Sequence, residues 1–102
     1  MTFAVLRKAE AQALKAARWY DKKNPGKGTD FLLELDKVYQ LIQQRPSLHP
    51  RVPARGRPDT YRVHVMKRFM YNVCFRVRID GILVVAVVHQ SRRSSHWTRN
   101  LP

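Results

Sequence analysis

The sequence predicts an α+β fold in which an N-terminal helical hairpin packs on one face of a small, mostly antiparallel, twisted sheet. Two observations support this fold. Residues 8–23 and 29–45 carry apolar side chains at helical spacing, and a short Asn-Pro-Gly stretch separates the two segments. Residues 71–89 alternate as strands do and are interrupted by Asp80-Gly81. Helices followed by strands favour a layer of helices on an antiparallel sheet.

The first expected helix carries a stripe of alanines. They recur at helical spacing through residues 8–23, which suits the close approach of a second helix, whereas Trp19 falls off the stripe. Thr29 and Asp30 are expected to open the second helix as its cap and first-turn acid, and Pro46 closes it. The short link predicts an antiparallel hairpin whose apolar stripes need the sheet for stability.

The remaining strands are shorter. Residues 2–6 alternate weakly and predict a first strand, and residues 46–59 are rich in proline and arginine and predict a long loop. Residues 61–66 alternate again. Their polar members, Arg62 and His64, are expected to extend the basic side of the hairpin that follows.

Asp80-Gly81 lies between two apolar runs, which is a strong signal for a two-residue type I′ hairpin turn. This turn would place apolar pairs on one face: Ile79–Ile82, Val77–Val84, Phe75–Ala86 and Val73–Val88. The opposite face would carry Arg78–Leu83, Arg76–Val85, Cys74–Val87 and Asn72–His89. The hairpin is therefore expected to have one core face and one open face that is both basic and apolar.

The length of 102 residues and the hydrophobic content of 44% predict a single domain over residues 1–102. The one cysteine, Cys74, rules out an internal disulfide and suits a reducing cytoplasm. The longest apolar run, residues 82–88, is far shorter than the roughly 20 residues that span a bilayer. We therefore expect a cytoplasmic protein without a membrane segment.

Charge dominates the composition, with 20 Lys and Arg residues against 7 Asp and Glu residues and a net charge of +13. Residues 51–102 hold eleven basic and two acidic residues, and ten of the eleven are arginine. Arginine presents a planar fork that suits carboxylate and phosphate. This balance predicts an acidic partner, either an acidic protein segment or nucleic acid. A basic nucleic-acid-binding module is therefore one open interpretation.

The order of elements and four local motifs resemble the RelE/ParE superfamily of toxins from type II toxin–antitoxin systems. The motifs are Ala16-Ala-Arg-Trp-Tyr20 with Pro25-Gly-Lys-Gly28, Phe31-Leu-Leu-Glu-Leu35, Arg68-Phe-Met-Tyr-Asn-Val-Cys-Phe-Arg76, and residues 84–89 followed by Arg92, Arg93, Trp97 and Arg99. Met70 stands where the family usually has proline. The resemblance implies a growth-inhibiting toxin that a co-expressed acidic antitoxin neutralises.

The resemblance leaves the target open because the superfamily divides. RelE-like members cleave messenger RNA on the ribosome with basic side chains and a Tyr or His near the C-terminus, whereas ParE-like members are understood to poison DNA gyrase. Met70 and the His-x-x-Arg pattern at His89–Arg92 look more ParE-like, so we favour gyrase. The alternative is a ribosome-dependent messenger RNA endonuclease.

Two sets of candidate residues follow. Cleavage of RNA needs a proton acceptor, a proton donor and cations for the developing charge. His89 and His64 are candidates for the acid and base, and Arg76 and Arg92 for charge stabilisation; the same residues could instead bind the antitoxin. We expect the antitoxin or target to contact Arg62, Arg76, Arg78, Leu83, Val85, Val87, Arg92, Arg93 and Trp97. No metal-ligand spacing is present, and we expect neither a metal nor a cofactor.

Overall fold

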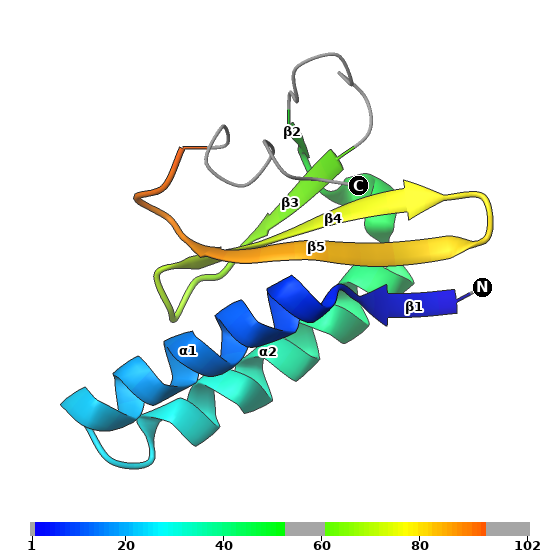
Figure 1. The fold of residues 1–102 in the computed structure, drawn as a ribbon. Coiled ribbons are helices and arrows are strands. Elements are labelled where there is room, and N and C mark those ends of the chain that lie inside the picture. Colours follow the sequence, from blue (N-terminus) through cyan, green and yellow to red (C-terminus); the bar gives the residue numbers. More distant parts are fainter. Residues whose placement is uncertain (1, 53–60, 94–102) are drawn as a thin grey trace.

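The computed structural model describes residues 2–52 and 61–93, and it has two helices on one side of a five-stranded sheet (Figure 1). The elements in chain order are β1 (Thr2–Val5), α1 (Arg7–Lys23), α2 (Lys27–Gln44), the 3₁₀ turn η1 (Pro46–Leu48), β2 (Arg51–Val52), β3 (Tyr61–Val65), β4 (Tyr71–Arg78) and β5 (Gly81–His89). The predicted helical hairpin and mostly antiparallel sheet are confirmed.

The strand order is β1-β5-β4-β3-β2. All neighbours are antiparallel except β1, which runs parallel to β5 and pairs Thr2–Val5 with Gly81–Val84. The expected first strand therefore exists and forms an edge of the sheet. At the other edge, β2 is a two-residue strand inside the segment that the sequence predicts as loop.

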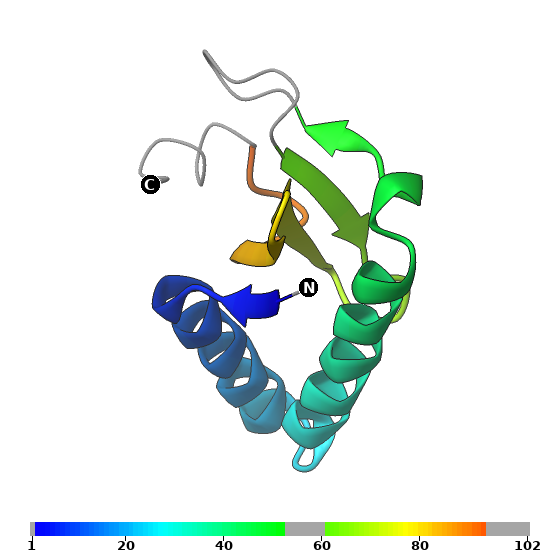
Figure 2. The ribbon, with the colours of Figure 1, turned by 90° about the vertical axis from the view of Figure 1, so that its right-hand side faces the viewer.

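The two helices pack closely through the alanine stripe. Ala9, Ala13, Ala16 and Ala17 are all buried on α1. Gly28 on α2 lies so near α1 that a Cβ atom placed on it would be 2.3 Å from the Ala17 carbonyl oxygen. Figure 2 shows α1 and α2 meeting at their connecting turn and spreading apart toward β1.

The start of α2 differs from the expectation. The helix begins at Lys27 rather than near Thr29, and Gly26 is its N-cap with a positive φ of 92°. Glycine adopts that conformation without a steric penalty, so the N-cap lies three residues before Thr29, the expected cap. Asp30 does lie in the first turn, as predicted.

The predicted register of the β4–β5 hairpin is wrong. Ile79 and Asp80 form the turn, and Arg78 pairs with Gly81. Phe75 then pairs with Val84, whereas Cys74 pairs with Ala86, so Val85 is an extra residue that makes a bulge in β5. After this extra residue, each side chain of β5 lies on the face opposite to the one that unbroken alternation would give it.

Both faces of the sheet are apolar as a result. Val73, Phe75, Ile82, Val84 and Val87 face the helices and join the main core. The other face carries a second buried cluster, made of Val52, Tyr61, Cys74, Val85, Ala86 and Val88. The sequence predicts an open face here, but Val85 is only 3% exposed and Cys74 1% exposed.

Candidate binding groove beside the last strand

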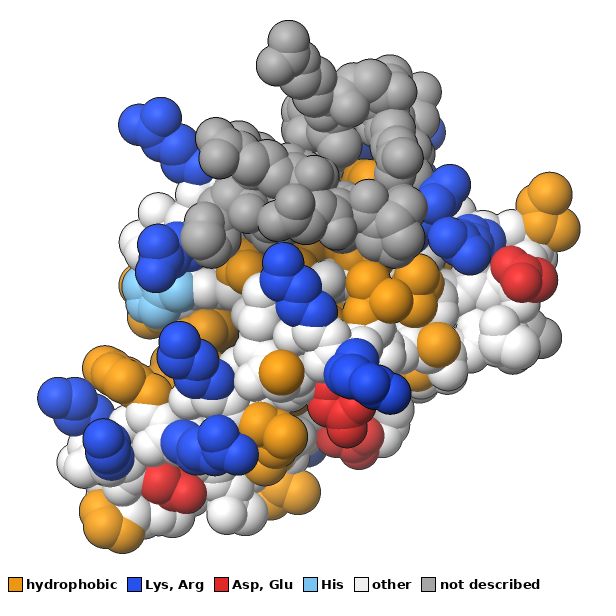
Figure 3. Space-filling view, viewed as in Figure 1, with side chains coloured by type: hydrophobic (Ala, Val, Ile, Leu, Met, Phe, Trp, Pro, Cys, Tyr) orange, Lys and Arg blue, Asp and Glu red, His pale blue; other side chains and the backbone are white. Residues whose placement is uncertain are grey.

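A groove of about 560 Å³ lies between α1 and the end of β5, and we call it the basic groove. α1 contributes Lys15 and Trp19 to its lining, and the start of β4 contributes Tyr71. His89 and Arg92 come from the end of β5 and the turn that follows it. In Figure 3, Lys and Arg side chains are spread along α1 and toward the end of β5.

The groove exists because β1 is shorter than β5. β1 pairs with β5 only as far as Val84, and beyond this point α1 runs beside the strand. Gln12 of α1 closes part of the unpaired edge, because its Oε1 atom accepts a hydrogen bond of 2.8 Å from the Val87 backbone N–H. This hydrogen bond fixes α1 against β5 at the wall of the groove and gives the Val87 backbone N–H an acceptor.

His89 is held by its neighbours at the end of β5. Its ring contacts Tyr71 edge-on with 5.3 Å between ring centroids. The Ser91 backbone N–H donates to Nδ1 of His89 at 3.1 Å, so the neutral ring carries its proton on Nε2. His89 therefore presents a hydrogen-bond donor, which suits binding an anion better than removing a proton from a substrate.

Aromatic surface and positive charge meet in the groove. Trp19 is 52% exposed, and Nζ of Lys23 lies 5.6 Å from the centre of its ring. Burial raises the pKa of Tyr71, with Tyr20 adding to the rise and Arg92 opposing it, so the phenol stays protonated at neutral pH. The cations can bind carboxylates of a partner, and the exposed aromatic ring beside them can contact apolar side chains of the same partner.

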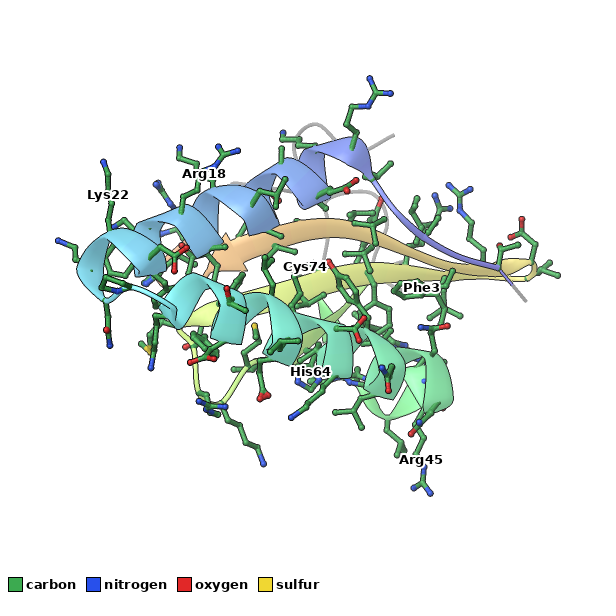
Figure 4. All side chains as sticks on the ribbon, turned by 90° about the horizontal axis from the view of Figure 1, so that it is seen from below. Phe3, Arg18, Lys22, Arg45, His64 and Cys74 are labelled. Carbon is green, nitrogen blue, oxygen red and sulfur yellow. The ribbon has the colours of Figure 1, made fainter. Side chains whose placement is uncertain are left out.

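The candidate catalytic residues do not converge. His64 lies on β3 beneath α2, where its neighbour is His49, with Nε2 of His49 3.0 Å from Nδ1 of His64 (Figure 4). Arg76 pairs with Leu83 and Tyr61 and therefore lies on the opposite face of the sheet. Only His89 and Arg92 line the same groove. Within the described residues, the predicted acid, base and cations lie at three separate places.

The sequence-based prediction placed Arg62 and His64 on the wrong face of the sheet. They pair with Phe75 and Val73, so they lie on the helix side of the sheet and not beside Arg76. The Arg62 guanidinium donates to the carbonyl oxygen of His49 at 2.7 Å and to that of Ser47 at 3.3 Å. Arg62 therefore helps to hold the turn before β2 in place through one of its terminal nitrogens.

The predicted contact surface is changed by the bulge. Arg76, Arg78 and Leu83 share one face, as the sequence predicts. Val87 instead lies in the helix-side core, and His89 pairs with Tyr71 rather than with Asn72. Val85 is on the predicted face but buried, so it cannot be an accessible contact.

The remaining sequence-based expectations concern the residues after β5, Cys74, metal binding and membrane-spanning helices. Arg92 and Arg93 are exposed after β5, whereas Trp97 lies outside the described residues. Burial raises the pKa of the Cys74 thiol to about 12, which makes it an inert core side chain.

Residues 2–52 and 61–93 contain no group of three or more His, Cys, Asp or Glu side chains that could hold a metal ion. Neither described helix is long and apolar enough to cross a membrane.

Sequence reasoning missed the α1 side of the groove. Lys15 and Trp19 were not among the predicted contacts, although Trp19 falls off the alanine stripe and so was expected to be partly exposed. A large aromatic side chain on the solvent side of an amphipathic helix was the available signal.

Comparison with known proteins agrees with this architecture. Residues 4–94 match the family model described as the ParE toxin of the type II toxin–antitoxin system parDE. A solved structure described as the chromosomal ParDE system from P. aeruginosa superposes with a TM-score of 0.74 at 19% identity, covering 87% of this chain and 95% of that one. No curated protein sequence gives a significant match.

The family model together with the fold identifies the chain as a toxin of the RelE/ParE superfamily. Because the family model spans most of the sequence, the chain belongs to the ParE toxin family of type II toxin–antitoxin systems.

Proposed function

We propose that this protein inhibits growth by binding DNA gyrase in the cytoplasm, and that an acidic cognate antitoxin neutralises it. The observation that supports a binding mechanism is the separation of the candidate catalytic residues. His64 lies under α2, Arg76 lies on the far face of the sheet, and His89 lies in the basic groove. General acid–base cleavage needs these groups within hydrogen-bond reach of one phosphate.

The surface that we assign to the antitoxin is the basic groove. Its cations Lys15 and Arg92 suit carboxylates, and Trp19 offers an apolar anchor point. Arg93 extends the same positive region after β5, and Arg76 with Arg78 forms a second basic patch on the opposite face. The predicted gene arrangement is a neighbouring reading frame that encodes a small acidic protein.

Two assays run side by side test the target. The purified protein is added to gyrase with relaxed plasmid, and separately to a ribosome translating a defined messenger RNA. We expect loss of supercoiling and intact messenger RNA. Codon-phased cleavage of the messenger RNA with normal supercoiling would instead favour the endonuclease alternative.

A pair of matched variants tests the groove. Lys15→Ala with Arg92→Ala should weaken antitoxin binding by about tenfold or more, because two cations leave the contact surface. Lys22→Ala with Lys37→Ala removes the same charge from other exposed helix positions and should leave affinity within about twofold. Equal affinities of the two variants would show that the antitoxin docks elsewhere. Salt-dependent binding to random nucleic acid, without growth arrest, would favour the non-toxic module.

A further inference from the structure

The helical hairpin carries a second groove, in which the sign of the charge is reversed. This groove of about 230 Å³ lies between α1 and α2, close to β1. Leu14, Leu32 and Tyr39 are among its apolar walls, and Glu10 of α1 and Asp36 of α2 line it as well. We call it the acidic-rimmed groove.

The two carboxylates are notable because the chain has few acids and uses others structurally. Asp21 accepts a hydrogen bond of 2.8 Å from the Gly28 backbone N–H, and Glu34 lies 3.7 Å from Arg68. Glu10 and Asp36 are both exposed, and no Lys or Arg within the described residues forms an ion pair with either of them. Among residues 2–52 and 61–93, the side-chain hydrogen bond that Asp36 accepts comes from the neutral amide of Gln40, at 3.1 Å. Both charges are therefore free to attract a ligand.

Tyr39 lies within the field of both carboxylates. Its pKa is raised to about 12 by burial first, and then by Glu10 and Asp36. Of the described residues, two acidic side chains and no Lys or Arg line this groove, although the whole chain carries +13. In Figure 3, acidic side chains over the helices, below the sheet, lie beside hydrophobic side chains and beside Lys or Arg side chains.

The apolar part of the groove is accessible to a partner. Leu14 is 43% exposed and Leu32 38% exposed, and they come from different helices of the same groove. Single exposed leucines are common on protein surfaces. Here two of them share one depression with two unpaired acids, which is the arrangement of a binding site for an amphipathic segment.

We propose that the acidic-rimmed groove docks a basic amphipathic segment of a partner protein, with apolar side chains in the groove and Lys or Arg beside Glu10 and Asp36. Charge complementarity selects this occupant, because an acidic segment would place like charges against the rim. The site is separate from the basic groove, and the proposal does not depend on which cellular target the toxin has.

Peptide binding to the full chain tests the proposal. The probes are a fluorescent amphipathic peptide of Leu and Lys and a Leu–Glu peptide of the same length. The net charge of +13 attracts the Leu–Glu peptide and repels the Leu–Lys peptide. Binding of the Leu–Lys peptide would therefore not be explained by the net charge, and we expect it to bind.

Charge-matched variants locate the binding. Glu10→Gln with Asp36→Asn should weaken Leu–Lys binding by about tenfold or more and leave Leu–Glu binding no weaker. Asp30→Asn with Asp80→Asn makes the same change of charge at exposed positions outside the groove and should leave Leu–Lys affinity within about twofold.

A second comparison tests the apolar walls. Leu14→Ala with Leu32→Ala should also weaken Leu–Lys binding, whereas Leu33→Ala, at a 61% exposed position outside the groove, should not. Circular dichroism melts verify that each variant is folded.

Three results would overturn the proposal. One is that the Leu–Lys peptide does not bind, or binds the Glu10→Gln/Asp36→Asn variant as tightly as the original chain. Another is sedimentation as a dimer that Leu14→Ala with Leu32→Ala dissociates, which would assign the groove to a second copy of this chain. The third is displacement of the peptide by the acidic antitoxin.

Discussion

His49 and His64 share a hydrogen bond that depends on their protonation. Nδ1 of His49 lies 3.1 Å from the Arg45 carbonyl oxygen, which can only accept, so His49 donates through this atom. Its Nε2 then accepts from Nδ1–H of His64 at 3.0 Å. Two fully protonated rings would place N–H against N–H, so the arrangement favours neutral histidines.

The His64 environment predicts a loss of stability in acid. Burial, His49 and Lys67, in that order, lower the pKa of His64 from its ordinary value of 6.5. The unfolded chain therefore binds a proton at His64 more readily than the folded protein does. The contribution of neutral His64 to folding stability is complete above its ordinary pKa of 6.5 and is lost as the pH falls below 6.5. Melting temperatures from about pH 7.5 to about pH 5.5 should fall, and His64→Gln should make the decline shallower.

His89→Gln is the matched control for this effect, because His89 lies in the basic groove and not beside His49. The control variant should keep the full decline of melting temperature with falling pH. An unchanged decline in His64→Gln would show that other groups carry the pH dependence.

At the scale of the elements, the close approach of α1 and α2 depends on Gly28. An added Cβ would lie 2.3 Å from the Ala17 carbonyl oxygen and within 3 Å of the Asp21 side chain, and backbone atoms cannot move away cheaply. Gly28→Ala should therefore cost about 1–3 kcal/mol of unfolding free energy, as overpacked sites do. Urea unfolding followed by circular dichroism measures this change.

The neighbouring substitution Thr29→Ala is the control for the helix interface. Thr29 is exposed, and its replacement should change the unfolding free energy by no more than about 0.5 kcal/mol. If both variants unfold at the same urea concentration, the two helices are not packed as closely as described.

The positions of the elements were predictable because their periodicity is strong. The alanine stripe and the alternating residues 71–78 identify the main helices and strands directly. The bulge at Val85 was not predictable, because Val85 lies inside a run of Leu, Val and Ala. Both faces of a strand with this sequence are apolar, so the pattern does not show where an extra residue is inserted. A two-residue strand such as β2 is also too short to produce a pattern.

The candidate site was only partly predictable, for a related reason. Residues 61–66 alternate, and Arg62 and His64 were therefore expected to extend the basic side of the hairpin. The sheet instead buries apolar side chains on both faces, and the pairing of β3 with β4 decides which face each residue takes. Local alternation cannot determine that pairing.

For the whole molecule, charge should govern how fast an acidic partner associates. The net charge of +13 is long-range, whereas the contacts in the basic groove are short-range. Raising the salt from a low to a physiological concentration should slow association with the acidic antitoxin by about tenfold and change dissociation much less. Stopped-flow fluorescence at several salt concentrations measures both rates, and an association rate independent of salt would contradict electrostatic steering.

The parallel pairing of β1 with β5 links the start of the chain to its last strand. Thr2 pairs with Gly81, and its backbone N–H donates to the Asp80 carbonyl oxygen at 2.9 Å. During synthesis, β1 leaves the ribosome long before β5 exists, so the sheet cannot close on that edge until Gly81–Val84 has been made. Without β5 the basic groove lacks one of its walls, so the surface that we propose for the antitoxin forms only after Gly81–His89 joins the sheet.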